Sequence, residues 1–205
     1  MYRQKGLPGL LKASAIVLIF NLLVYDLHNF LYYVVYSPYG YFDGYDAVNT
    51  IQSVFFYHYA VLLLIASIVF LGYNARKPLG LVGGLLLLVE SVLKIGWNIV
   101  RRVLVSGENW ELVNRIGNWV NPIQTLLFIA AFILIAIYVR HKGMLVVGII
   151  IAVLEMMILA TYQYLYGAFG LGYEAWAYIG WGIEWMCGIM LVIYLFMWSK
   201  NAKIA

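Results

Sequence analysis

Two residues of opposite charge lie four positions apart inside an apolar stretch that is long enough to cross a membrane. The stretch from Arg76 to Arg102 carries Glu90 and Lys94 near its middle. An ionisable side chain at the bilayer centre costs at least about 2.5–3.5 kcal/mol, so such residues normally face protein or water and often mark functional sites. The spacing places both side chains on one helix face, where they can form an ion pair. The pair therefore predicts either ion handling or a contact that only fixes helix packing.

The pattern around Glu90 occurs a second time along the chain. When residues 77–97 are aligned with residues 142–162, three pairs of residues match in type. A glycine aligns with a glycine, an acid with an acid and an aromatic residue with an aromatic residue: Gly83 with Gly148, Glu90 with Glu155 and Trp97 with Tyr162. Residues seven apart share one stripe of a helix, because seven residues are close to two turns. The first apolar stretch carries Ser14, Asn21 and His28 at the same spacing. Since internal repeats are common in transporters, the pattern predicts pseudo-repeated helical hairpins.

Four further polar residues lie within predicted spans: Asp26, His28, His58 and Glu184. Counting about 1.5 Å per residue from the predicted helix ends places them in one layer of the outer half of the membrane. Glu90, Lys94 and Glu155 lie at or slightly below this layer. Acids and histidines inside membranes line proton relays and ion paths. We therefore predict an outward-facing cavity in which Glu90, Lys94, Glu155, Asp26 and Glu184 handle an ion, a proton or a small solute.

The histidines allow a second interpretation. His28 and His58 at matched depth on adjacent antiparallel helices could supply both axial ligands of a b-type haem. A non-haem metal site that combines them with Asp26 and Glu184 is disfavoured, because residues two apart on a helix point in different directions. No metal site is predicted. The chain also lacks the GxSxG, HExxH, P-loop and dinucleotide motifs, so no catalytic residue is predicted.

The composition indicates the environment of these residues. Of the 205 residues 65% are hydrophobic and 11% charged, and the mean hydropathy is +0.89, which predicts an integral membrane protein in a lipid bilayer. The net charge is +4, but the basic residues lie in short clusters between apolar spans, a pattern of membrane topology and not of nucleic-acid binding. The single cysteine, Cys187, excludes an intrachain disulfide.

The apolar runs predict six transmembrane helices as three hairpins within one domain over residues 1–205. Asn49 and Asn121, each followed three residues later by glutamine, are predicted as helix N-caps. The polar segment 106–118 is expected to lie at the membrane surface, and the first apolar run is read as a retained helix and not a cleaved signal peptide. The predicted helices cover about 9–36, 49–73, 78–103, 121–138, 143–165 and 175–198.

The charges predict the orientation. With six helices, both termini lie on one side, and the loops on that side contain basic residues but no acidic ones. The opposite loops hold all the acids that lie outside the spans. By the positive-inside rule, both termini are cytoplasmic in a protein of the cell membrane. The basic residues on the terminal side are Arg3, Lys5, Lys12, Arg76, Lys77, Arg140, Lys142, Lys200 and Lys203.

Taken together, these patterns predict an all-α membrane protein that is transporter-like and moves an ion, a proton or a small solute through its buried acids. The alternative is a membrane-embedded subunit of a respiratory or other electron-transfer complex, with haem b at His28 and His58 or without a cofactor. A chain of this size with few extramembrane residues is also expected to associate with other membrane subunits or with copies of itself.

Overall fold

Six long helices make up the structure, a computed structural model that describes residues 6–31, 45–106, 109–163 and 173–202. All six are long and apolar enough to cross a membrane. They confirm the predicted all-helical fold with six apolar spans. The helices are α1 (Leu7–Phe30), α2 (Tyr45–Asn74), α3 (Pro78–Ser106), α4 (Trp110–Val139), α5 (Lys142–Gln163) and α6 (Tyr173–Asn201).

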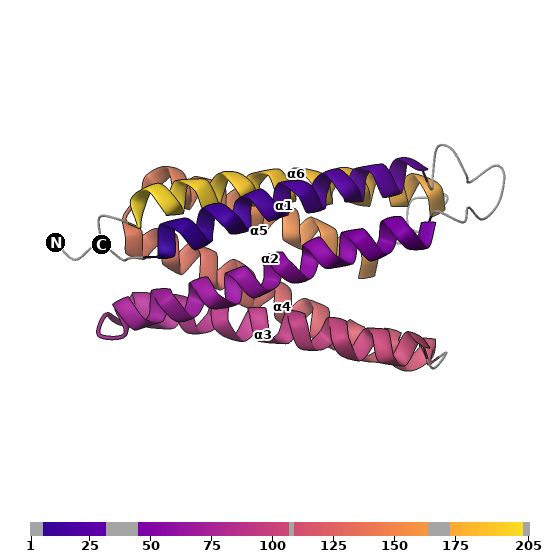
Figure 1. Cartoon of the computed structure of the whole chain (residues 1–205), viewed down its shortest axis with the longest axis horizontal. Coiled ribbons are helices and arrows are strands. Elements are labelled where there is room, and N and C mark those ends of the chain that lie inside the picture. The colour runs from indigo at the N-terminus through magenta and orange to yellow at the C-terminus, as the bar shows by residue number, and fades with distance from the viewer. Residues whose placement is uncertain (1–5, 32–44, 107–108, 164–172, 203–205) are drawn as a thin grey trace.

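The helices form a closed ring. Each one packs against its neighbours in the chain, and α6 completes the circle by packing against α1. Figure 1 shows that α1 begins and α6 ends at the same end of the bundle. We call this the terminal end, and the opposite one the far end. The turns between α2 and α3 and between α4 and α5 also lie at the terminal end, because successive helices run in opposite directions.

Most apolar side chains point away from the ring. Only 22–39% of the residues in the most apolar window of each helix are buried, and large side chains such as Phe20, Ile68 and Val146 are about half exposed. A soluble protein rarely exposes so much contiguous apolar surface. Around a transmembrane bundle, the same surface contacts lipid tails, so the fold is suited to a bilayer environment.

Aromatic side chains fill the centre of the ring near the terminal end. The rings of Phe132 and Tyr194 lie 4.6 Å apart between centroids, and those of Phe70 and Trp198 lie 5.4 Å apart. The Tyr194 hydroxyl donates a hydrogen bond of 2.6 Å to the Phe132 carbonyl oxygen. These four residues are almost completely buried. They join α2, α4 and α6 into a closely packed core in this half of the bundle.

Two predicted helix starts are wrong. α2 begins at Tyr45 and α4 at Trp110, so Asn49 and Asn121 lie inside helices and cap neither. α4 continues through Pro122. Transmembrane helices tolerate an internal proline because nearby groups can satisfy the backbone carbonyl that loses its partner.

The polar segment before Pro122 does not form a separate surface element. It supplies the first turns of α4, and these turns pack against the far part of α3. Val113 is buried, and Gly117 lies close enough to the Trp97 ring that a Cβ there would be 3.3 Å from it. The few apolar positions of this amphipathic segment are therefore sufficient to extend the hairpin of α3 and α4.

The other boundaries follow the prediction more closely. α3 and α6 each end three residues later than expected, at Ser106 and Asn201. The last predicted residues of the first helix (32–36) and of the fifth (164–165) lie outside the described residues. The apolar runs thus locate every helix, whereas cap-like residues misplace two of the starts.

Glycine allows close packing between α3 and α4, which generates a stability prediction. A Cβ at Gly83 would lie 3.1 Å from the Ile135 Cγ1 atom and 3.3 Å from the Leu134 Cβ atom. We expect Gly83→Val to force the helices apart and to lower the free energy of unfolding by about 1–3 kcal/mol. Thermal unfolding in detergent, followed by tryptophan fluorescence, measures the change.

The matched control is Gly72→Val in α2. A Cβ at Gly72 meets nothing within 4 Å, so the same substitution adds only a lipid-facing side chain. Equal unfolding temperatures for the two variants would contradict the close approach of α3 and α4.

Candidate functional site

A polar cavity of about 800 Å³ lies inside the ring. Its lining extends from the middle of the bundle, at Glu90, toward the far end, at Arg101. All six helices contribute at least one lining residue, so the complete ring is needed to form it. We call it the central cavity. Its lining includes Tyr25, Gln52, Phe56, Glu90, Lys94, Trp97, Asn98, Arg101, Gln124, Phe128, Glu155 and Glu184.

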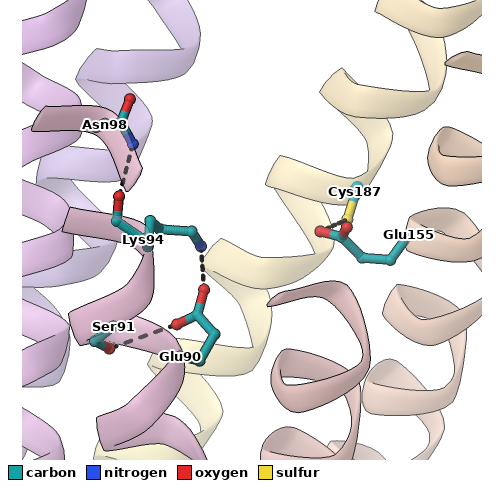
Figure 2. Close-up of polar contacts among 6 residues, drawn as sticks. All are labelled: Glu90, Ser91, Lys94, Asn98, Glu155 and Cys187. Atoms are coloured by element: carbon teal, nitrogen blue, oxygen red, sulfur yellow. Dashed lines mark hydrogen bonds and ion pairs between the residues drawn. The ribbon is translucent and has the colours of Figure 1, made fainter. Parts of the chain in front are cut away.

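An ion pair lies at the deep end of the central cavity (Figure 2). The Lys94 Nζ atom is 2.6 Å from the Glu90 Oε1 atom, one helical turn away on α3. The Glu90 side chain is 1% exposed and that of Lys94 22%. The ammonium also lies 5.0 Å from the centroid of the Phe128 ring, a cation–π distance. The predicted pair therefore exists, and it faces the cavity and not the lipid.

Glu155 approaches the same cavity from α5. Figure 2 shows its carboxylate directed from α5 toward the side on which Glu90 and Lys94 lie. The Cys187 thiol of α6 is 3.5 Å from its Oε1 atom, the length of a weak hydrogen bond. Glu90 follows the start of α3 by 12 residues and Glu155 that of α5 by 13, so both lie roughly 18–20 Å from the terminal end. Two acids on parallel helices thus reach one cavity at matched depth.

Glu184 is the third carboxylate in the lining. It accepts a hydrogen bond from the Tyr25 hydroxyl across the contact of α1 with α6. Asp26 is the neighbour of Tyr25 but is not part of the lining. Its Oδ1 atom accepts a hydrogen bond of 3.1 Å from the Trp181 indole nitrogen. Of the two acids predicted beside the histidines, the structure brings Glu184 into the cavity and holds Asp26 between helices.

The two histidines are not brought together. Phe20 of α1 and Phe55 of α2 stack with ring centroids 5.7 Å apart, which aligns the two antiparallel helices. His28 lies eight residues beyond Phe20 toward the far end, and His58 lies three residues beyond Phe55 toward the terminal end. At about 1.5 Å per residue, they are separated by roughly 16 Å in depth.

This separation differs from the matched depth expected from the sequence. His58 is exposed, and its Nδ1 atom is 2.7 Å from the Val54 carbonyl oxygen of its own helix. Two imidazoles so far apart do not fit as axial ligands of one haem. Within the described residues, no group of three histidine, cysteine or acidic side chains is arranged to hold a metal ion.

The lining contains polar residues that the sequence interpretation missed. On α3, Asn98 and Arg101 continue the stripe of Glu90 and Lys94 at helical spacing toward the far end. On α4, Gln124 and Thr125 face the cavity one turn after Asn121, a residue that was interpreted as a helix cap. A search for polar stripes at intervals of three and four residues would have found both sets.

No known protein helps to assign this cavity. Comparisons with protein families, with curated proteins and with solved structures found no match to this chain.

The ion pair generates a test of charge burial. We expect Lys94→Met to destabilise the protein, because it leaves the Glu90 carboxylate buried without a cation. Removing one member of a fully buried pair costs about 3–5 kcal/mol, and the cost is smaller here because Lys94 is 22% exposed. Thermal unfolding in detergent checks the loss.

The double variant Glu90→Gln/Lys94→Met removes both charges and is expected to regain much of the lost stability. If the double variant unfolds at the same temperature as Lys94→Met, the loss comes from side-chain packing and not from an unpaired charge.

Proposed function

We propose that this chain is a small membrane transporter that binds a proton and a small positively charged solute in its central cavity, with Glu155 as the principal binding carboxylate. The observation that carries the proposal is the meeting of three carboxylates, from α3, α5 and α6, in one polar cavity at membrane depth. Glu90 and Lys94 form the fixed part of the site, and Glu184 contributes from the opposite side.

The charge balance at the deep end supports this role. Lys94 forms an ion pair with Glu90. Among the described residues, Glu155 forms no ion pair: it interacts with Lys94 only at longer range and accepts a hydrogen bond from the neutral Cys187 thiol. A carboxylate held inside the bundle without a directly paired cation is costly in a low-dielectric environment. Taking up either a proton or a cationic group removes this cost. Competition between the two for Glu155 would couple solute binding to proton release.

The shape of the bundle supports a transport cycle. The terminal half is filled by aromatic side chains, including Phe70 and Trp198, while the far half contains the cavity. In alternating access, a site is closed toward one side of the membrane while it is open toward the other. The structure is consistent with such a state, with the cavity directed toward the far end.

Topology and repetition form part of the proposal. The basic residues at the terminal end, among them Arg76, Lys77 and Arg140, favour a cytoplasmic location of that end in a cell-membrane protein, by the positive-inside rule. The central cavity then faces outward. The matched depths of Glu90 and Glu155 agree with a pseudo-repeat in which the hairpins beginning with α3 and α5 are equivalent.

Proton exchange in proteoliposomes tests the function. A pH gradient, acidic inside and reported by a quenched fluorescent amine, is challenged with external guanidinium or choline, both of which keep their positive charge over the pH range used. Exchange of a solute for protons relieves the quenching. We expect Glu155→Gln to abolish this response because an amide can neither release a proton nor balance a cation, and Glu90→Gln to reduce it strongly.

The matched control is Glu111→Gln, which changes an exposed acid in the first turn of α4 outside the central cavity. It should respond as the unmodified protein does. A gradient that persists with both solutes, or a response that Glu155→Gln leaves unchanged, contradicts transport through this carboxylate.

A further inference from the structure

A second cavity, of about 930 Å³, lies at the terminal end and takes no part in the proposed transport. It lies where the turn from α2 to α3 meets the turn from α4 to α5. Pro78 begins one span and Val139 ends another, and both line the cavity. The cavity is therefore at the level where the helices leave the hydrocarbon core. We call it the basic cavity.

Its polar lining is cationic. Lys77 and Arg140 line it together with His141, and none of the acidic residues that the structure describes does so. The Lys77 ammonium lies 5.5 Å from the centroid of the Tyr138 ring, a contact that keeps the side chain on this wall. Arg140 has a left-handed backbone, with φ of 56°. This conformation is uncommon for arginine. Arg140 ends α4 in this conformation, and its side chain lines the basic cavity.

Hydrogen-bond donors add to the positive charge. The His141 Nδ1 atom accepts a hydrogen bond of 3.1 Å from the Met144 backbone N–H and so caps the start of α5. In neutral histidine, this acceptor role places the ring proton on Nε2, which leaves that nitrogen as a donor. The N-terminus of α3 begins at the lining residue Pro78. Helix N-termini favour anions.

The remaining wall is apolar and open to the lipid. Leu79 is 46% exposed and Ile137 43% exposed, and both line the cavity. Charged side chains at the membrane surface beside apolar side chains below it match the two parts of a phospholipid, the headgroup and the upper acyl chain. A soluble anion would use only the cations and would gain nothing from Leu79 and Ile137.

We propose that the basic cavity binds an anionic membrane phospholipid. Lys77 and Arg140 hold the headgroup phosphate, His141 donates to the headgroup, and Leu79 and Ile137 contact the acyl chains. Basic pockets between transmembrane helices are known to bind anionic lipids. This lipid would join the turn between α2 and α3 to that between α4 and α5, and so stabilise the terminal end of the ring.

Lipid-dependent stability of the full chain tests the proposal. The purified protein in detergent is titrated with phosphatidylglycerol or with phosphatidylcholine of the same acyl chains, and the unfolding temperature is measured. We expect only phosphatidylglycerol to raise it. In Lys77→Gln/Arg140→Asn, we expect the affinity for phosphatidylglycerol to fall about 30-fold, which corresponds to about 1 kcal/mol for each lost cation. Asparagine is chosen at position 140 because it tolerates the left-handed backbone.

The control variant is Lys200→Gln. Lys200 is an exposed lysine in the last turn of α6, at the same end of the bundle but outside the basic cavity. It should keep the full effect of phosphatidylglycerol. A similar loss of affinity for phosphatidylglycerol in this variant would mean that the lipid binds through the total charge of this end and not through the basic cavity. That result would overturn the proposal.

Two further measurements cover the remaining outcomes. Glycerol phosphate, the headgroup without acyl chains, should leave the unfolding temperature unchanged, and a full shift with it would assign the site to a soluble anion instead. Native mass spectrometry of protein taken from mixed membranes counts retained lipids even if the double variant is too unstable to titrate. We expect the unmodified protein and the conservative variant Lys77→Arg/Arg140→Lys to retain equal amounts of phosphatidylglycerol. We expect Lys77→Gln/Arg140→Asn to retain none. Retention of both lipids in proportion to their abundance overturns the site.

Discussion

The cost of placing charge inside a bilayer is the constraint on which this structure depends. Glu90 is 1% exposed at the middle of a membrane-length helix, and its Lys94 partner is 22% exposed, toward the central cavity. Neither side chain could face lipid tails without a large penalty. α3 must therefore turn this face inward, and the other helices must leave polar space around it. The closed ring of six helices, with a central cavity to which each contributes, satisfies both requirements.

The two halves of the ring use different physical means of stabilisation. In the terminal half, aromatic rings and close contacts at Gly83 provide packing, which is the main source of helix association where lipid tails are as apolar as the side chains. Toward the far half, the ion pair of Glu90 with Lys94 and hydrogen bonds such as that from Tyr25 to Glu184 lie around the central cavity. A closely packed half beside a hollow, polar half gives a bundle that keeps its fold around a cavity.

The two cavities have opposite chemistry. The deep end of the central cavity, far from lipid headgroups, holds the carboxylates of Glu90 and Glu155 and the ammonium of Lys94. The basic cavity carries Lys77 and Arg140 at the membrane surface and is suited to an anion. Because both depend on the positions of α3 and α5, a lipid that holds their N-terminal turns would also hold Glu90 and Glu155 at their common depth.

The sequence by itself determined the six apolar spans and the inward position of Glu90, Lys94 and Glu155, because span length and the penalty for lipid-facing charge are local properties. It did not determine the relative depth of residues that lie on different helices. The stacking of Phe20 on Phe55 separates His28 from His58, and contacts between α1 and α6 bring Glu184 into the cavity while Asp26 stays with Trp181. It also misplaced the starts of α2 and α4, since Asn49 and Asn121 resemble caps until packing extends the helices past them. Only tertiary structure decides these features, because the sliding of one helix along another is set by side chains distant in the sequence.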